Sequence, residues 1–136
     1  MERVFVDSDI ILDLLGGREP FYKYSAELFS LADKGKVELH VSSLSFANLN
    51  YILSKQFSAE QARKKLLKFK TLVTVLSVTD KIVELSLASD FKDFEDGLQY
   101  FTAIENGIKL LLTRNLKDYK TAQISVMTAE QFLKGN

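Results

Sequence analysis

The sequence contains no cysteine and no tryptophan, and it has one proline and one histidine. The lack of cysteine excludes disulfide bonds and thiolate metal sites, and it fits a cytoplasmic location. Lysine plus arginine and aspartate plus glutamate both number 18, so the chain lacks the general positive field that nucleic-acid-binding proteins often carry. A bound cation or a local basic patch must therefore supply any attraction for an anionic partner.

Long apolar runs are also absent. No run approaches the roughly 20 residues that cross a bilayer, and the segment before Asp7 is too short and too polar for a signal peptide. The chain of 136 residues is long enough to bury a substantial core, and its apolar and charged contents are ordinary for a folded protein. We expect a single domain over residues 1–136, located in the cytoplasm and without a membrane partner.

Short apolar segments alternate with segments of helical periodicity along the whole chain. Strands are expected at 3–6, 37–41, 72–76, 108–112 and 124–126, with helices at about 10–15, 21–34, 44–55, 58–70, 80–89, 94–106 and from 129 onward. Ser8 or Asp9 is expected to cap the first helix, with Asp7 as a less favoured alternative. This alternation predicts an α/β fold in which right-handed crossovers cover both faces of a parallel sheet.

Oxygen-bearing side chains follow two of the expected strands. Asp7 ends the first strand, Thr113 and Asn115 follow the fourth, and Asp96 lies in the first turn of the preceding helix. Ligands of such sheets bind beyond the carboxyl ends of the strands, where the strand order reverses. If strands one and four are neighbours, Asp7, Asp96 and Asn115 meet there and suit Mg²⁺, which binds through one or two carboxylates and retains waters.

The other polar residues of these segments each have a structural interpretation beside a functional one. Asp93 is expected to cap its helix, and Glu95 is a first-turn acid that stabilises the helix dipole. Asp118 is a turn former or a site residue, with neither favoured. For Asp13 we expect a surface salt bridge, and for His40 a structural role.

Two further groups concern the substrate or a partner. The basic run 61–70 is expected to be a solvated helix face rather than a phosphate track. Arg114, in the turn after the fourth strand, is the better candidate for contacting a substrate phosphate. Phe21, Tyr22 and Tyr24 are expected to pack in the core, with a partner-binding groove as the alternative.

Three segments together resemble the PIN domain family, most closely the VapC-like toxin ribonucleases. The segments are Val6–Leu15, Asp93–Gln99 and Thr113–Tyr119, and the pattern that they form in this order spans essentially the whole chain. The resemblance implies a three-layer fold with a five-stranded parallel sheet flanked by helices. It also implies Mg²⁺- or Mn²⁺-dependent cleavage of RNA phosphodiester bonds, a homodimer and an antitoxin protein as partner.

The resemblance assigns roles to individual residues. Asp7 and Asp96 match metal-binding acids, Asn115 matches the fourth position of the site, and Ser8 and Thr113 match supporting hydroxyls. The usual second acid, a glutamate, is replaced by Asn48.

Asn48 is therefore the departure from the family pattern. We expect it to face inward and to donate to Asp7 or Asp96, or to offer its carbonyl to the water shell of a metal ion. An inward-pointing Asp93 would restore the lost charge.

Three hypotheses follow. The first is a metal-dependent endoribonuclease that serves as the toxin of a toxin–antitoxin pair. The second is a degenerate PIN domain that binds RNA or a protein without cutting, and Asn48 motivates it. The third is a phosphoacceptor receiver domain, ranked far behind because the third strand ends in Leu76 and Ser77 rather than in a phosphorylatable aspartate.

Overall fold

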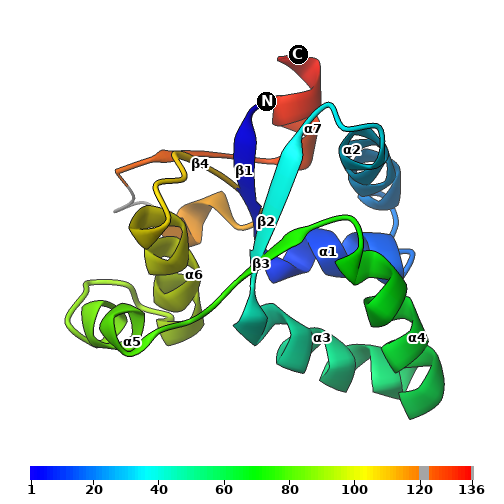
Figure 1. Cartoon of the computed structure of the whole chain (residues 1–136), viewed down its shortest axis with the longest axis horizontal. Helices are drawn as coiled ribbons and strands as arrows, with labels where there is room; N and C mark the ends of the chain where they lie inside the picture. The colour runs from blue at the N-terminus through cyan, green and yellow to red at the C-terminus, as the bar shows by residue number, and fades with distance from the viewer. Residues whose placement is uncertain (120–122, 136) are drawn as a thin grey trace.

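The sheet organises the molecule, and Figure 1 shows it between two groups of helices. The computed structural model describes residues 1–119 and 123–135, and within them five parallel strands lie in the order β3-β2-β1-β4-β5. The strands are β1 (Arg3–Val6), β2 (Glu38–Ser42), β3 (Thr74–Leu76), β4 (Leu110–Leu112) and β5 (Ser125–Met127). The predicted three-layer α/β fold with a five-stranded parallel sheet is confirmed.

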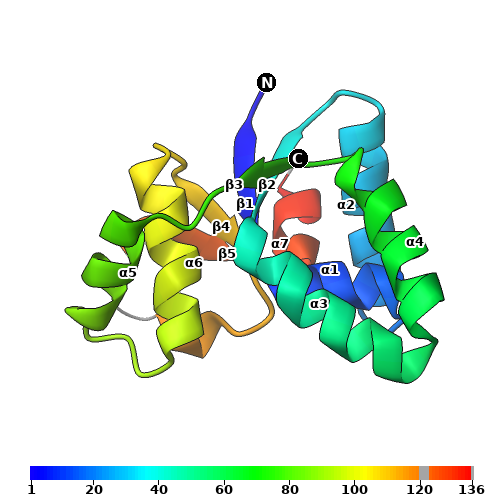
Figure 2. The same ribbon diagram turned by 60° about the horizontal axis from the view of Figure 1, so that its bottom comes forward.

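Helices cover both faces of this sheet. The larger group packs on one face and comprises α1 (Ser8–Leu15), α2 (Tyr22–Asp33), α3 (Ser43–Gln56), α4 (Ala59–Lys70) and α7 (Ala129–Lys134). The other face carries α5 (Asp80–Leu87) and α6 (Phe94–Glu105), and a 3₁₀ helix, η1 (Leu116–Tyr119), follows β4. Figure 2 shows the same division after a 60° turn, with α5 and α6 apart from the other helices.

The strands are apolar because both of their faces are buried. In β1, Val4 and Val6 belong to the larger core, beneath α1 to α4 and α7, whereas Phe5 points to the opposite core with Tyr100 of α6. Leu111 of β4 joins Phe5 in that second core. The alternation of side chains along each strand thus fills two separate cores.

Polar side chains begin the helices. Asp93 caps α6, Ser58 caps α4, and Thr128 forms a capping box with Gln131, as the sequence predicts. For α1 the favoured cap, Ser8 or Asp9, is wrong, and the alternative, Asp7, is confirmed. Asp7 occupies the cap position, which places Ser8 and Asp9 inside the first turn of the helix.

The central pairing of β1 with β4 brings the key segments together. Val6 pairs with Leu112, and the backbone N–H of Asp7 continues the ladder by donating to the carbonyl of Leu112 at 2.9 Å. The carboxyl ends of β1 and β4 are therefore neighbours at the point where the strand order reverses. The receiver-domain hypothesis is wrong, because such domains have the strand order 2-1-3-4-5.

Candidate metal centre

Asp7 is the buried centre of the site, with only 7% of its surface exposed. Its Oδ1 accepts the backbone N–H of Ser8 at 2.7 Å, and its Oδ2 accepts the hydroxyls of Thr113 at 2.9 Å and Tyr119 at 3.1 Å. Burial, reinforced by the charge of Asp9, raises the pKa of Asp7 from 3.8 to about 7, although these hydrogen bonds lower it. Burial also raises the pKa of Tyr119, so its hydroxyl is a neutral donor.

Asp9 is a site residue that sequence reasoning missed. Its Oδ2 accepts the hydroxyl of Thr113 at 3.2 Å, the backbone N–H of Arg114 at 2.9 Å and the amide of Asn115 at 3.3 Å. Burial raises its pKa, and its Oδ1 is buried without a hydrogen-bond partner among the described residues. The spacing of Asp7 and Asp9 could have indicated this role. One acid is enough to cap the helix, so a second acid two residues away suggests another function.

Asp96 approaches these acids from α6. Its side chain is half-buried and makes no hydrogen bond or ion pair within residues 1–119 and 123–135. Burial raises its pKa from 3.8 to about 7, and the charges of Asp7, Asp93, Asp118 and Asp9 raise it further, in that order. Asp7 and Asp96 therefore share one electrostatic environment, although they lie 89 positions apart in the sequence (96 − 7).

Asp93 and Asp118 lie at the margin of this cluster. Asp93 is an exposed helix cap whose Oδ1 accepts the backbone N–H of Asp96 at 3.2 Å, which matches the structural expectation. Asp118 is exposed in η1, and its backbone N–H donates to the carbonyl of Asn115. Both residues act on Asp96 through their charge, and Asp118 also helps to form the turn.

Asn48 corrects an expectation. It does not donate to Asp7 or Asp96; its Nδ2 donates to Oε1 of Glu95 at 3.2 Å. Asn48 is half-buried rather than inward-facing, because Tyr51 and Ile52 on the same helical stripe are exposed. Glu95, expected to act only on the helix dipole, therefore places a carboxylate beside the residue that replaces the usual glutamate.

Ser8 lies on a small polar network beneath the site. Its Oγ and Ser45 Oγ are 2.7 Å apart, and Gln99 Nε2 lies 3.2 Å from Ser8 Oγ and 3.1 Å from Ser45 Oγ. The network joins α1, α3 and α6. Ser45 and Gln99 were missed, although Gln99 follows Asp96 by three residues and so lies on nearly the same face of α6.

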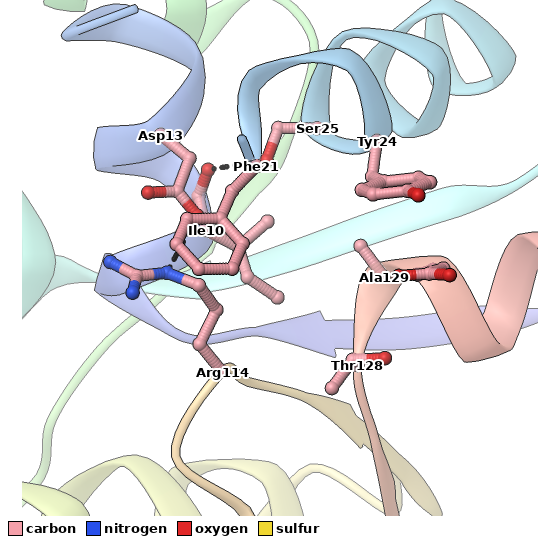
Figure 3. A pocket seen from close by; sticks show the side chains of 9 residues that line it. Ile10, Asp13, Phe21, Tyr24, Ser25, Arg114, Thr128 and Ala129 are labelled. Carbon is pink, nitrogen blue, oxygen red and sulfur yellow. Dashed lines mark hydrogen bonds and ion pairs between the residues drawn. The ribbon is translucent and has the colours of Figure 1, made fainter. Parts of the chain in front are cut away.

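Arg114, the candidate for a phosphate contact, lies between α1 and the start of α2. Its Nε forms an ion pair with Oδ2 of Asp13 at 2.8 Å, and its guanidinium lies 4.3 Å from the centre of the Phe21 ring. Figure 3 shows Arg114 reaching Asp13 beside the Phe21 ring, at a cavity of about 160 Å³ that Tyr24 also lines. These contacts connect the turn after β4 to α1 and α2, and the predicted contact of Arg114 with a substrate phosphate stays a prediction.

This arrangement also corrects the expectation for Asp13 and refines that for the aromatic residues. The salt bridge of Asp13 is buried rather than on the surface, since only 1% of its side chain is exposed. Phe21 and Tyr22 are exposed and do not belong to the core, whereas Tyr24 is half-buried and packs against the larger core, as expected.

Two other groups lie outside the site. His40 is buried in β2 beside Glu38, and burial lowers its pKa, in agreement with a structural role. The charged side chains of the run 61–70 lie mostly on the exposed face of α4, while Ala62, Leu66 and Phe69 are buried. This pattern matches the expected solvated helix face.

The donors of the site fit a hard cation. Within the described parts of the chain, no three Asp, Glu or His side chains form a group that would hold an ion through protein ligands alone. Mg²⁺ needs only one or two carboxylates, because it retains several waters. Asp7 and Asp96 offer two such carboxylates, the unpaired Oδ1 of Asp9 offers an acceptor for a water ligand, and Asn115 retains its Oδ1.

The fold and the acidic cluster define a class: a three-layer α/β domain with carboxylates gathered at the switch point of a parallel sheet. A family model described as "PIN domain" matches residues 3–117. The chain is also 34% identical to Ribonuclease VapC1 of Aquifex aeolicus (strain VF5), over 96% of this chain and 93% of that protein. The chain belongs to the PIN domain family.

Solved structures give the same fold. One is VapBC2 from Rickettsia felis, bound to a DNA fragment from its own promoter. It matches with a TM-score of 0.67 and 21% identity, over 92% of this chain and 96% of that one. A toxin–antitoxin complex from Klebsiella pneumoniae matches with a TM-score of 0.69 and 20% identity, over 93% of this chain and 97% of that one. In the described parts of this chain, no helix is both long and apolar enough to cross a membrane.

Proposed function

We propose that this protein is a metal-dependent endoribonuclease that hydrolyses RNA phosphodiester bonds and acts as the toxin of a toxin–antitoxin pair. The observation that carries the proposal is the convergence of Asp7, Asp9 and Asp96, two of which have a pKa near neutrality because burial and neighbouring charges disfavour ionisation. A divalent cation relieves this repulsion. The 34% identity to Ribonuclease VapC1 over nearly the whole chain supports the same reading.

In this proposal Asp7 and Asp96 hold Mg²⁺ or Mn²⁺ together with water molecules, and Asn115 completes the catalytic set. The bound cation would lower the pKa of a water molecule and neutralise charge on the scissile phosphate. Thr113 and Tyr119 orient the Asp7 carboxylate through hydrogen bonds at 2.9 Å and 3.1 Å. Asp93 and Asp118 keep the surroundings of Asp96 negative, which favours a bound cation over an empty site.

The partners belong to the same proposal. The substrate is RNA, an antitoxin protein controls the activity, and two copies of the chain form a homodimer in the cytoplasm. Similarity to the Klebsiella pneumoniae toxin–antitoxin complex, over 93% of this chain, supports the antitoxin. Light scattering of the purified chain, alone and co-expressed with any small protein found to be encoded beside it, tests both assemblies.

A second candidate function is a PIN domain that binds RNA or a protein without cleaving it. Asn48 favours it, because this amide cannot supply the charge of the usual glutamate. Glu95 argues for activity instead, because its carboxylate accepts a hydrogen bond from Asn48 and so lies beside that residue. We propose that Glu95, rather than Asp93, compensates for the missing acid.

The deciding experiment combines binding of Mn²⁺ with cleavage of RNA. We expect millimolar Mn²⁺ to raise the melting temperature of the wild type, since a ligand at 100 times its dissociation constant stabilises by about 2.7 kcal/mol. Asp96→Asn should stabilise the metal-free protein, by removing a crowded charge, and should abolish both the Mn²⁺ effect and cleavage.

Asp33→Asn is the matched control, because Asp33 is an exposed acid in α2. It should leave the Mn²⁺ effect and the cleavage rate at their wild-type values. An unmoved wild-type melting temperature would exclude catalysis at this centre. Cleavage that persists in Asp96→Asn would point to a contaminating nuclease.

A further inference from the structure

Among Ser8, Ser45 and Gln99, one of the two serine hydroxyl protons has no acceptor inside the group. Nε2 of Gln99 donates to both serine oxygens, at 3.2 Å and 3.1 Å, so each oxygen already accepts a hydrogen bond. The bond between the two hydroxyls, 2.7 Å long, uses the proton of only one of them. The second proton must point elsewhere.

Ser45 and Ser8 differ in where that second proton can go. Ser45 has an alternative acceptor in Ser42 Oγ, at 3.4 Å, which is the long limit for such a bond. Within residues 1–119 and 123–135, Ser8 Oγ has no acceptor besides Ser45. When Ser45 donates to Ser8, the Ser8 proton is free to point out of the network.

Outside the network lies an open groove of about 430 Å³. Ser8 and Asp9 line it at one end, and the remaining lining residues are Leu12, Asn48, Leu49, Tyr51, Ile52 and Glu95. Ser8 is half-buried, in contrast to Ser45 and Gln99, which are almost fully enclosed. An anionic oxygen held in this groove would be an acceptor for the Ser8 proton.

Packing alone does not explain an amide at position 99. The side chain is 3% exposed, and its Oε1 is buried without a hydrogen-bond partner in the described parts of the chain. A methionine of similar length would fill the space without leaving an acceptor unpaired. What the amide adds is a nitrogen that donates to both serine oxygens.

We propose that Ser8 Oγ donates a hydrogen bond to a nonbridging phosphate oxygen of the RNA strand, and that Gln99 and Ser45 are positioning residues that direct this proton into the groove. The inference rests on the proposed function, since it places the scissile strand beside Asp7 and Asp9. It gives Ser8 a substrate contact and gives α3 and α6 a role in orienting that contact.

The test uses RNA with one phosphorothioate at the cleaved position, with its two diastereomers separated. Sulfur accepts hydrogen bonds poorly, so wild type should cleave slowly when sulfur faces Ser8. Ser8→Ala should slow cleavage of the all-oxygen substrate by about 10- to 100-fold, the value of a hydrogen bond to a charged group, and should lose the sensitivity to that sulfur. Its Mn²⁺-induced rise in melting temperature should match that of wild type.

Gln99→Met separates positioning from folding. It should reduce cleavage in the same way as Ser8→Ala, and the double variant should be no slower than Ser8→Ala, because both changes remove one interaction. Thr102→Val is the control on the same helix. Thr102 is fully buried, its hydroxyl donates only within α6 to the carbonyl of Leu98, and its loss should leave cleavage unchanged.

The outcomes are distinct. Wild-type cleavage by Ser8→Ala, or a sulfur effect that survives in it, overturns the inference and leaves the proposed function intact. Fully additive losses in the double variant overturn the positioning role of Gln99. A wild type that neither binds Mn²⁺ nor cuts RNA overturns the proposed function and this inference together.

Discussion

The carboxyl groups of Asp7 and Asp96 lie close to other acids in the folded protein. Because of this crowding, the stability of the fold depends on pH. Folding raises the pKa of each from 3.8 to about 7. Between these values the folded protein holds protons that the unfolded chain has released. Stability from these two groups is therefore fully present below about pH 4 and is lost as the pH rises through about 7.

The first residue-scale prediction concerns pH. The melting temperature of the metal-free protein should fall by several degrees, about 4 or more, between about pH 5 and pH 8. Asp96→Asn should flatten this dependence, because one of the two groups no longer titrates. Calorimetric scans at constant ionic strength measure it. A melting temperature that rises over this interval in wild type would contradict the crowding of these acids.

Tyr119 offers a second prediction at this scale. Its hydroxyl donates to Asp7 Oδ2 at 3.1 Å, and this bond lowers the pKa of Asp7. Tyr119→Phe removes the bond while keeping the ring that packs against Phe91. We expect a loss of about 1 kcal/mol of stability and a shift of the Mn²⁺-binding midpoint to higher pH, because the ligand must be deprotonated.

The control for Tyr119→Phe is Tyr22→Phe, an exposed tyrosine of α2. It should alter neither the stability nor the pH at which Mn²⁺ binds. Titrating Mn²⁺ into each variant by calorimetry at several pH values gives the midpoint. An unshifted midpoint in Tyr119→Phe would show that this hydrogen bond does not tune Asp7.

At the scale of elements, Arg114 connects three segments: the turn after β4, helix α1 through Asp13, and the start of α2 through Phe21. Asp13 is almost fully buried, so its charge depends on this partner. Removing one member of a buried pair leaves an uncompensated charge, which costs more than the pair contributes. The link therefore determines how the turn bearing Thr113 and Asn115 is held against α1.

We expect Arg114→Met to lower the free energy of unfolding by about 3 kcal/mol. The double variant Asp13→Leu/Arg114→Met should recover most of the loss, because no buried charge remains. Urea denaturation of the two variants and wild type gives the three values. If Arg114→Met cuts RNA poorly but is as stable as wild type, the predicted contact of Arg114 with a substrate phosphate would explain the loss instead.

At the scale of the whole molecule, the balance of charge limits how RNA is held. Formal net charge is zero, and the basic residues of α4 lie on a solvated helix face where Lys64 pairs with Glu60 at 3.3 Å. The proposed contacts are a cation, a serine hydroxyl and the groove rather than many lysines. Few phosphates would then be neutralised by side chains of the protein.

The last prediction is a shallow salt dependence of RNA binding. With at most about two phosphates neutralised, the slope of log K against log salt should be no steeper than about −1.4 for single strands. Fluorescence anisotropy in saturating Mg²⁺ with a non-cleavable RNA measures it. A slope of about −3 or steeper, reduced by Lys64→Glu or Lys68→Glu, would show that α4 is the phosphate track after all.

Much of this structure could be predicted from local sequence patterns, because helix caps and strands depend on residues that are close together in the chain. The helix caps at Ser58, Asp93 and Thr128 follow from side chains that satisfy free N–H groups a few residues away. The strands follow from apolar runs that both cores require. The pairing of β1 with β4 was predicted only conditionally, from the assumption that Asp7 and Thr113 belong to one site.

Tertiary structure decided the residues whose partners come from distant segments. Nothing near Asn48 in the sequence indicates Glu95, and nothing near Arg114 indicates Asp13, because packing of separate helices makes each contact. The importance of Asp9 also appears only when Thr113, Arg114 and Asn115 lie beside it.

By itself, the sequence determined the order of strands and helices, the family resemblance and the acids Asp7 and Asp96, since these depend on periodicity, capping and motif spacing. Only the tertiary structure decided which polar groups form hydrogen bonds, form ion pairs or line the same cavity. Such sharing acts over a few ångströms, and residues more than a hundred positions apart, such as Asp7 and Thr113, come that close only when the sheet has formed.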